Sequence, residues 1–339
     1  MKIGLVGGSG YAGGELLRLI VGHPHFDAVA ISAHSNAGEE ITAIHPQLLS
    51  YTGRKFTAFN PADFDQCQLI FLALPHGESA KVVKQLPASA KIVDLGADYR
   101  LHSENSWKKY YGGDFAGTWS YGLADLPGKN VEIASANKVA NPGCYATSII
   151  LGLAPIAGIA DLNDVVVVAA SGTTGAGRTA KINLIASEVT GSLTSYKFGG
   201  VHQHTPEIEE TLSTLSGSEV KVSFTPILAP MPRGILSTIT VKANDGLSIE
   251  DLRSTYSNYF SHTPFVTLLP EGQMPKTASV LGSNHAQMQV ALDEHAGRIV
   301  VSVAIDNLGK GAAAQAIHNA NLMMGIDPTS GLLGNGLGA

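Results

Sequence analysis

The sequence has little cysteine, no long apolar run and no basic cluster, and each absence excludes a class of protein. Its 339 residues contain two cysteines, Cys67 and Cys144, which excludes a disulfide framework and fits a reducing, intracellular setting. No apolar stretch approaches the roughly 20 residues that a membrane helix needs. The net charge of -6 and the lack of a basic run argue against a nucleic-acid binder. Because a strand is expected directly after Met1, we expect no signal peptide and a cytoplasmic protein.

Length and composition predict a globular enzyme with two domains. A chain of 339 residues is too long for one small core. Apolar residues make up 44% and charged residues 15%, which are ordinary values. Glycine is the exception, with 38 residues, and this favours tight turns and close backbone approaches of the kind that nucleotide sites use.

Cys144 is the residue with the clearest chemical potential. Pro142-Gly143 before it is a turn signal, and the apolar run Ser148–Leu153 after it is typical of a helix. The thiol is therefore expected at a helix N-terminus, where unpaired N–H groups and the helix dipole favour thiolate. A thiolate can attack a carbonyl carbon and carry an acyl group. The alternative is a small buried core residue, which is what we expect of Cys67.

A strand, a glycine loop and a helix follow one another in Lys2–Ile20, which is the context that the dinucleotide fingerprint requires. The loop reads GGSGYAG. Its spacing fits G-x-G-x-x-G from Gly8 and a G-x-x-G-x-x-G variant from Gly7 equally well. In both, glycine lets the backbone approach a pyrophosphate at the helix N-terminus. The predicted cofactor contacts in this loop are Gly7, Ser9, Gly10, Tyr11, Ala12 and Gly13.

The end of the next strand, expected over Ala28–Ser32, bears on the choice of cofactor. An NAD enzyme usually places Asp or Glu there to bind the ribose 2′-hydroxyl. Residues 32–36 read SAHSN and contain no carboxylate that would repel a 2′-phosphate. This predicts NADP(H), with Ser32 and Ser35 among its contacts.

Strands and helices continue to alternate, with strands expected over Leu69–Leu74 and Lys91–Leu95. This pattern predicts an α/β fold with a Rossmann-type, doubly wound parallel sheet that carries helices on both faces. Ligands bind at the carboxyl ends of such strands, which adds Pro75, His76 and Gly77 to the predicted cofactor contacts.

The pattern changes after Cys144, where longer and more alternating strands are expected over residues 165–171, 220–224, 235–241 and 298–305. They predict an α+β domain with a mixed or antiparallel sheet. We expect an NADP-binding domain over residues 1–143, completed by the C-terminal segment 311–339 with a helix from Gly311 to Met324. Residues 144–310 would form the catalytic, substrate-binding and oligomerisation domain.

His202 and His204 flank one glutamine just before Thr205-Pro206, which is typical of a helix start. Both are therefore expected in a loop that enters a helix. A zinc site would need further ligands, and no Cys or His cluster accompanies them, so no metal is predicted. General acid–base work beside a cysteine fits better, because imidazole titrates near neutral pH. Solvated surface histidines are an equally weighted alternative.

Together these motifs resemble the N-acetyl-γ-glutamyl-phosphate reductases, relatives of the aspartate-semialdehyde dehydrogenases, over nearly the whole chain. Matching segments are the glycine loop, Asp94–Arg100, Tyr121–Leu123, Asn141–Thr147, Ser171–Arg178, His202–Ile208, Pro230–Gly234 and Asp306–Gln315. The sequence departs from the family pattern at Gly96 and Tyr99, where Ser and Phe are usual. It also has Gln203 in place of a common Arg and Ala314 in place of Gly.

The resemblance implies an NADPH-dependent, phosphorylating aldehyde dehydrogenase of arginine biosynthesis, a homodimer or homotetramer. It would reduce N-acetylglutamyl 5-phosphate to the 5-semialdehyde through a Cys144 thioester. His202 or His204 would move the protons, with His202 favoured. Further cofactor contacts would be Ser171, Gly175, Asn307 and Lys310, although Lys310 could be only a solvated loop charge. Substrate contacts would be Arg100, Tyr121, Asn141, Arg178 and Arg233.

Three alternatives remain open from the sequence. The same chemistry could act on aspartyl phosphate or on N-acetyl-aminoadipyl phosphate. A cysteine hydrolase would turn over without NADPH. A non-catalytic redox sensor would bind NADP without any turnover.

Overall fold

The computed structural model describes residues 1–332 and 334–338, which fall into two units. The first unit comprises residues 1–142 and 312–332, and the second comprises residues 143–311 and the described residues after 333. The C-terminal segment expected in the first domain was 311–339, and its residues 333 and 339 lie outside the described residues. Residues 334–338 group with the second unit instead, because the Leu337 N–H donates to the Leu281 carbonyl at 2.8 Å.

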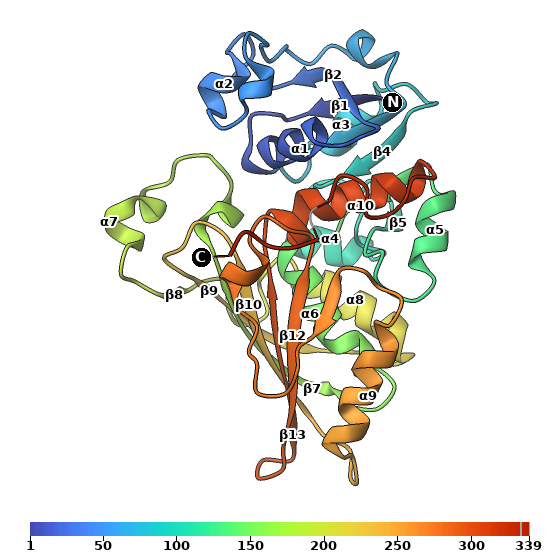
Figure 1. The fold of residues 1–339 in the computed structure, drawn as a ribbon, viewed down its shortest axis with the longest axis vertical. Coiled ribbons are helices and arrows are strands. Elements are labelled where there is room, and N and C mark those ends of the chain that lie inside the picture. Colours follow the sequence, from blue (N-terminus) through green and yellow to red (C-terminus); the bar gives the residue numbers. More distant parts are fainter. Residues whose placement is uncertain (333, 339) are drawn as a thin grey trace. The chain divides into compact units, whose positions relative to one another are not determined.

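Six parallel strands form the sheet of the first unit, in the order β2-β1-β3-β4-β6-β5 (Figure 1). Their bounds are β1 Lys2–Val6, β2 Asp27–Ser32, β3 Leu69–Leu72, β4 Lys91–Asp94, β5 Ser120–Tyr121 and β6 Lys138–Ala140. β1 and β3 are neighbours although β2 lies between them in the sequence. The strand order therefore reverses at their carboxyl ends, which is where open α/β sheets bind ligands.

Both faces of this sheet are covered. In β3, Leu69 and Phe71 belong to one apolar cluster, while Ile70 and Leu72 belong to another. This explains the unbroken apolar run of the strand. Cys67 lies in the second cluster at 5% exposure, which confirms its prediction as a core residue.

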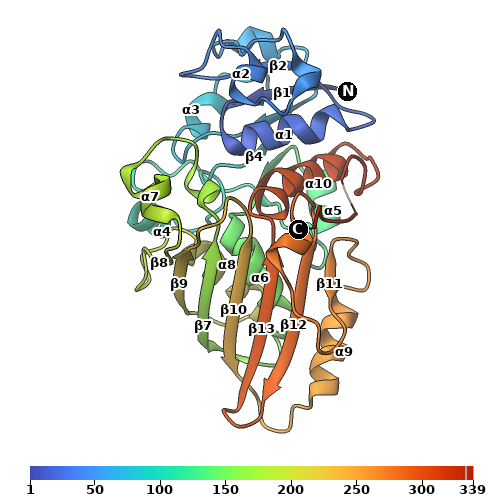
Figure 2. The same ribbon diagram turned by 60° about the vertical axis from the view of Figure 1, so that its left-hand side comes forward.

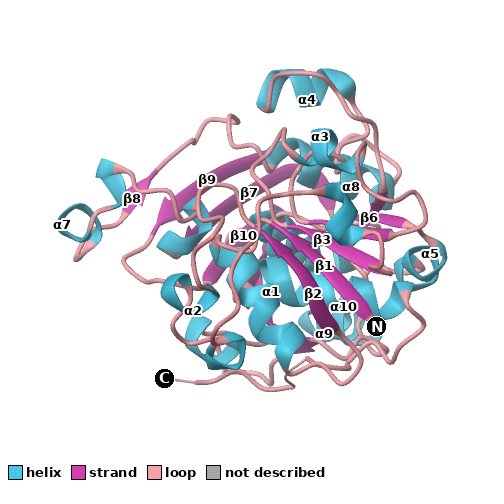
Figure 3. Ribbon diagram, turned by 90° about the horizontal axis from the view of Figure 1, so that it is seen from above, coloured by secondary structure: helices cyan, strands magenta, loops and turns pink. Residues whose placement is uncertain are grey.

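The helices of the first unit lie on both sides of its sheet. Figure 3 shows α1 and α3 on opposite sides of β1 and β3, and α1 packs against α10. The helix bounds are α1 Tyr11–Val21, α2 Ile41–Ile44, α3 Ser79–Val83, α4 Glu104–Tyr110, α5 Lys129–Ser135 and α10 Ala314–Met323.

Seven strands form the mixed sheet of the second unit, in the order β11-β12-β13-β10-β7-β9-β8 (Figure 2). β10 pairs antiparallel with both β7 and β13, whereas β7 and β9 are parallel. The strand bounds are β7 Asp161–Ser171, β8 Thr194–Ser195, β9 Val222–Leu228, β10 Ile235–Lys242, β11 Val266–Leu268, β12 Ala286–Asp293 and β13 Arg298–Ile305.

Helices cover one face of this second sheet. α6 (Cys144–Leu153) packs on β10 and β13, α8 (Thr205–Ser216) on α6 and β9, and α9 (Ile249–Tyr259) on β12. The contact of α6 is close, because a Cβ on Gly152 would lie 2.7 Å from the Ile239 side chain. The opposite face, seen in Figure 2, leaves Val166 and Val168 of β7 40% and 42% exposed.

The predicted fold class is confirmed: a parallel Rossmann-type sheet is joined to a second sheet of mixed direction. β1 and β13 have the expected bounds, whereas β3 ends two residues earlier than expected and β9 begins two residues later. β11 and β12 were not predicted. Across residues 1–332 and 334–338, no helix has the length and apolar character needed to span a membrane.

Candidate active site

Cys144 is the first residue of α6, as predicted. The turn before it is held by Glu207 in the first turn of α8, whose Oε1 accepts the Gly143 N–H at 2.8 Å. Glu207 is only 2% exposed. On the other side lies Gly311, where a Cβ would approach the Cys144 Cβ to 2.7 Å. Glycine at 311 therefore leaves the room that the start of α6 needs.

The imidazole of His204 lies against this turn. A Cβ on Gly143 would come within 2.5 Å of the His204 Nε2, so the ring packs directly on the residue that precedes the thiol. His204 is the residue immediately before α8. The start of α8 thus supplies both a carboxylate and an imidazole to the turn that presents Cys144.

His202 has a different environment, enclosed by aromatic rings. The ring centroids of Tyr145, Tyr196 and Phe224 lie 5.1 to 5.9 Å from its own, all edge to face. Its Nδ1 accepts the His204 N–H at 3.1 Å, which places the proton of the neutral ring on Nε2. Burial, with a smaller effect of Lys197, lowers the pKa of His202 to about 4. His202 is 7% exposed, so the alternative of a solvated surface histidine is wrong for it.

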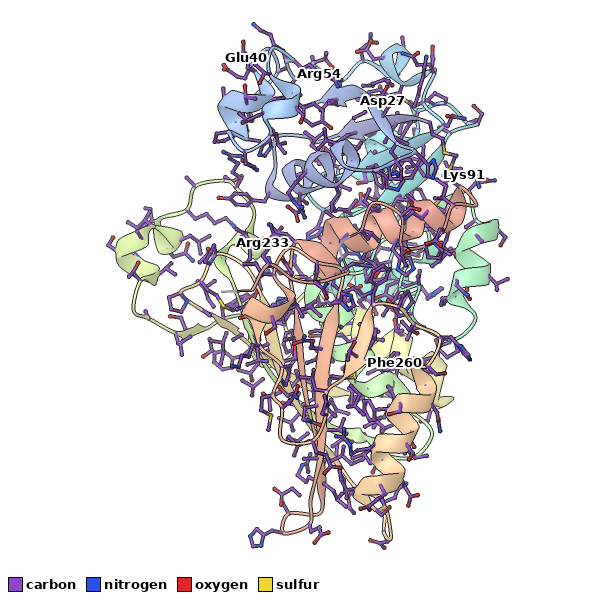
Figure 4. The ribbon with its side chains drawn as sticks, in the orientation of Figure 1. Asp27, Glu40, Arg54, Lys91, Arg233 and Phe260 are labelled. Atoms are coloured by element: carbon purple, nitrogen blue, oxygen red, sulfur yellow. The ribbon has the colours of Figure 1, made fainter. Side chains whose placement is uncertain are left out.

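Asp306 connects three loops at the end of the second sheet. Its carboxylate pairs with Arg233 through contacts of 2.7 and 3.1 Å, and Arg233 extends from the loop before β10 (Figure 4). It also accepts the backbone N–H groups of Gly282, Leu308 and Gly309. Asp306 has no exposed surface. A single buried carboxylate thus fixes the loops before β10 and β12 and the turn after β13.

Asn307 extends this network to the loop after β7. Its Oδ1 accepts the Gly234 N–H at 2.8 Å, and its Nδ2 donates to the Thr174 hydroxyl at 3.0 Å. Ser171 is buried at the end of β7, and its hydroxyl donates to the Gly172 carbonyl. Gly175 is exposed in the 3₁₀ turn Thr173–Ala176 that follows. Two predicted cofactor contacts, Ser171 and Asn307, therefore also hold this loop in place.

Lys310 lies in the π-helical turn Gly309–Ala313 and has no exposed surface. Its Nζ lies 5.6 Å from the centroid of the Phe265 ring. The alternative of a solvated loop charge is therefore wrong. The predicted helix over 311–324 begins as this π-turn and becomes α10 only at Ala314.

The glycine loop of the first unit is tightly packed. Gly7 has φ +89°, and a Cβ there would lie 2.3 Å from the Ala73 carbonyl oxygen that follows β3. A Cβ on Gly13 would lie 2.4 Å from the Gly7 carbonyl oxygen. Gly10, just before α1, is less crowded, because a Cβ there would have only the Gly7 carbonyl oxygen as a near neighbour, at 3.8 Å. This cradle leaves the N–H groups at the start of α1 accessible to a phosphate, which fits a dinucleotide.

Two serines and a loop adjoin the cradle. The Ser32 carbonyl accepts the Gly7 and Gly8 N–H groups, while its buried hydroxyl has no hydrogen-bond partner among the described residues. Ser35 is exposed three residues beyond the end of β2. After β3, Pro75 and His76 are exposed, and Asp98 accepts the Gly77 N–H at 2.8 Å. Among these groups the Ser32 hydroxyl is unpartnered within the described residues, whereas the Ser35 hydroxyl donates to the Asn36 side chain at 3.3 Å.

Comparisons with known proteins agree with this geometry. The family model "Semialdehyde dehydrogenase, NAD binding domain" matches residues 2–136, and "Semialdehyde dehydrogenase, dimerisation domain" matches residues 144–307. The N-acetyl-gamma-glutamyl-phosphate reductase of Acidothermus cellulolyticus is 52% identical over 99% of this chain and 98% of its own. That of Streptomyces coelicolor is 48% identical over 98% and 97%. This chain belongs to the N-acetyl-gamma-glutamyl-phosphate reductase family.

Solved structures support the fold. Aspartate semialdehyde dehydrogenase II from Vibrio cholerae superposes with a TM-score of 0.70 at 17% identity, covering 95% of this chain and 98% of that one. A probable aspartate-semialdehyde dehydrogenase from Pseudomonas aeruginosa gives 0.71 at 16% identity, covering 96% and 98%. At this identity the likeness is one of architecture.

The substrate contacts implied by the family motifs lie in very different surroundings. Arg100 is buried and donates to the carbonyls of Asn141 and Leu95, both at 2.7 Å. The amide of Asn141 donates to the Ala312 carbonyl and accepts from Asn319. Both residues thus support the first unit, in which Tyr121 is buried as well. Arg178 is exposed and Arg233 is half-buried.

Three functional residues escaped the prediction from sequence: Glu207, Asp306 and Asp98. Each lies inside a segment that matches the family, and this match is the only feature of the sequence that could have indicated its role. Asp98 accepts the N–H groups of Gly77 and Ala80, so it fixes the loop after β3. Apart from Leu308 and Gly309, which adjoin Asp306, the partners of these carboxylates are 18 to 73 residues away in the sequence, so no local pattern reveals them.

The departures from the family pattern have local effects. Gln203 accepts a hydrogen bond from the Lys197 ammonium at 2.8 Å, so a cation still lies at this position. At Gly96, a Cβ would lie 3.0 Å from both the Asp94 carboxylate and the Ser79 hydroxyl. Asp94 accepts from Ser79 and from the Gly96 N–H, and burial raises its pKa to about 7. Ala314, 1% exposed, is simply the first residue of α10.

Proposed function

We propose that this protein reduces N-acetyl-γ-glutamyl phosphate to N-acetylglutamate semialdehyde and inorganic phosphate, with NADPH as reductant. The observation that carries the proposal is the thiol of Cys144 at the start of α6, with the His204 ring against the preceding residue. Relatives named for this activity, about half identical over nearly the full chain, support it. We favour N-acetyl-γ-glutamyl phosphate over aspartyl phosphate as the substrate, because the relatives are named for the acetylated compound.

Cys144 carries the acyl group. Its sulfur attacks the acyl carbon, a C–S bond forms, the bond from that carbon to the phosphate oxygen breaks, and inorganic phosphate leaves. The N–H groups at the start of α6 have no partners within the helix, so they can hold the oxyanion that forms during the attack. NADPH, when bound, supplies the hydride that reduces the acyl group. Cleavage of the C–S bond then frees the aldehyde and returns the thiolate.

We assign the proton transfers to His204 rather than to His202. His204 takes the thiol proton and can give it to the departing phosphate oxygen, because its ring packs against the residue next to Cys144. His202 is poorly suited, since burial lowers its pKa to about 4 and its Nδ1 already accepts a backbone hydrogen bond. We propose that His202 positions His204 through that bond.

The two units divide the work in this proposal. The first would hold NADPH through the glycine loop, the Ser32 hydroxyl and the loop after β3, and the second would hold the substrate. Arg178 and Arg233 are the proposed anion contacts, because guanidinium groups bind carboxylate and phosphate in a bidentate manner. We place the reaction in the cytoplasm, where a catalytic thiol stays reduced.

We also propose that the protein is a homo-oligomer built on the second sheet. The support is its open face, on which Val166 and Val168 are 40% and 42% exposed, and the matching dimerisation-domain model. Burial of apolar side chains on such a face is the usual driving force for association. Sedimentation velocity decides the matter, and a monomer at micromolar concentration would disprove it.

The decisive assay runs in reverse: phosphate-dependent reduction of NADP with N-acetylglutamate semialdehyde. Wild-type protein should reduce NADP continuously only when phosphate is present, because phosphate must cleave the thioester. Without phosphate, reduction should stop after about one NADP per Cys144. Cys144→Ser should abolish turnover and leave the NADPH dissociation constant within a few-fold of wild type. Continuous NADP reduction without phosphate, or substantial turnover by Cys144→Ser, would contradict the thioester route.

A further inference from the structure

Asn284 is a buried amide that no described residue satisfies. It has no exposed surface, and neither its Oδ1 nor its Nδ2 has a hydrogen-bond partner within residues 1–332 and 334–338. Burial of an amide without partners is costly, and buried polar groups in native proteins are almost always paired. Other fully buried asparagines here conform to that rule, since Asn319 bonds to the Gly122 carbonyl and to Asn141.

Asn284 borders the turn that packs against the nucleophile. Two residues before it, the Gly282 N–H donates to Asp306 at 2.6 Å, and two residues after it, Ala286 pairs with Ile305. The carbonyl of the preceding Ser283 lies against Gly309, where a Cβ would be 2.3 Å from the oxygen. The same turn continues to Gly311, which abuts Cys144. Asn284 is therefore in a loop that packs on one end of a turn whose other end contacts Cys144.

The face of the sheet agrees with this placement. Ala286 and Met288 alternate with Gln287 and are fully buried, as is Val303 of β13, which contacts Gly152 of α6. Asn284 is also buried, and it lies two residues before the start of β12. That end of β12 pairs with the end of β13, which leads into the turn that reaches Gly311 and Cys144.

We propose that Asn284 hydrogen-bonds an amide group of a reactant held at Cys144. A carboxamide offers one acceptor and two donors, and an amide satisfies both kinds, whereas a phosphate, carboxylate or oxyanion would leave Oδ1 unpaired. This proposal rests on the proposed function, in which two reactants carry an amide. These are the acetamido group of the substrate and the carboxamide of the nicotinamide ring.

The first test separates a ligand contact from a structural role by thermal unfolding without ligands. Asn284→Leu keeps the number and branching of the side-chain heavy atoms and removes the unpaired amide, so its Tm should equal or exceed that of wild type. The matched control is Asn319→Leu, which should lower Tm because it leaves paired partners without their bonds. A fall in Tm for Asn284→Leu as large as that of Asn319→Leu would overturn the proposal.

The second test identifies the amide. Wild type and Asn284→Leu are compared with N-acetylglutamate semialdehyde and with 5-oxopentanoate, which lacks the acetamido group. They are also compared, by fluorescence titration of the binary complex, with NADPH and with its reduced 3-acetylpyridine analogue, which lacks the amide nitrogen. Wild type should prefer one of the two amide-bearing ligands by about tenfold or more, and Asn284→Leu should lose that preference.

The outcomes are distinct. Loss of the substrate preference assigns Asn284 to the acetamido group, and loss of the cofactor preference assigns it to the nicotinamide. If Asn284→Leu keeps both preferences, the proposal is wrong while the proposed function stands. If wild type lacks turnover with both aldehydes, the proposed function fails. The binary titration then still tests the cofactor arm, and an unchanged cofactor preference overturns the proposal there too.

Discussion

The glycine loop of the first unit and the Asp306 loops of the second unit are held in shape by opposite means. In the first, the absence of side chains lets Gly7 and Gly13 approach carbonyl oxygens where a Cβ would lie at 2.3 and 2.4 Å. In the second, one carboxylate collects Arg233 and three backbone N–H groups. A phosphate needs backbone N–H groups at close range, whereas a covalent step needs side chains in fixed positions.

The comparison implies that the two units should fail differently. A side chain added to the glycine loop should weaken cofactor binding and leave the reacting groups intact. Removal of a carboxylate or imidazole from the second unit should impair chemistry or stability and leave NADPH affinity nearly unchanged. The following predictions test that division, from the largest expected effect to the smallest.

The largest effect is expected from the two histidines of the second unit. His204→Ala should lower kcat by about 10²–10⁴, the range for a lost general acid–base group. His202→Ala should lower kcat less, because it removes only the acceptor of the His204 N–H. Both should bind NADPH as wild type does. Steady-state kinetics across pH 5.5–9 are the measurement, and a larger loss in kcat for His202→Ala would reverse the assignment.

Asp306→Ala should destabilise the protein by about 3–5 kcal/mol, because it leaves a half-buried Arg233 without its partner and several N–H groups without an acceptor. Equilibrium urea unfolding followed by hydrogen exchange of α6 is the measurement. The control is Asp293→Ala, an exposed carboxylate in the same unit, which should cost about 1 kcal/mol or less. If the two substitutions lowered the free energy of unfolding equally, Asp306 would not be the residue that holds these loops together.

Gly13→Ala should weaken NADPH binding by about tenfold or more, since the new Cβ would collide with the Gly7 carbonyl and shift the loop. Gly22→Ala at the end of the same helix is the matched control. Its nearest neighbour is 3.8 Å away and its φ is -92°, so binding should not change. Fluorescence titration of NADPH measures both. Unchanged NADPH affinity in Gly13→Ala would show that close packing of the glycine loop is not needed for cofactor binding.

The smallest effect is expected from pH between 7 and 5.5, and its sign should differ between the units. The pKa of His202 is about 4 when folded against an ordinary 6.5, so acid favours the unfolded second unit. Burial raises the pKa of Asp94 from 3.8 to about 7, so the same acid stabilises the first unit. Both tryptophans, Trp107 and Trp119, lie in the first unit, and their fluorescence reports it selectively. Hydrogen exchange of α6 reports the second, and a common direction would contradict the prediction.

Local patterns predicted the features that local forces determine. A proline-glycine turn before an apolar run is sufficient to start α6 at Cys144, and the glycine loop needs only its neighbouring strand and helix. The fold class follows from the alternation of strands and helices. β12 was not predicted, although Gln287 and Gln289 alternate with apolar residues in it.

Interactions between distant residues could not be predicted in the same way. Arg100 and Asn141 carry chemistry-bearing side chains inside family motifs, yet both are engaged in hydrogen bonds within the first unit. Our proposal of His204 in place of the favoured His202 rests on the burial of His202, which depends on Phe224 and Tyr196 at distant positions. Sequence spacing gives the pair of histidines, whereas only packing distinguishes them.

The carboxylate of Asp306 also has a consequence for protein engineering. Because it and Asn307 connect the loops around Thr174, Gly234 and Gly282, a loop grafted from a relative at one of these places disturbs the other two. New substrate preferences are more readily selected in the exposed stretch after Thr174, at residues 175–178, which contains none of these anchors and includes the proposed anion contact Arg178.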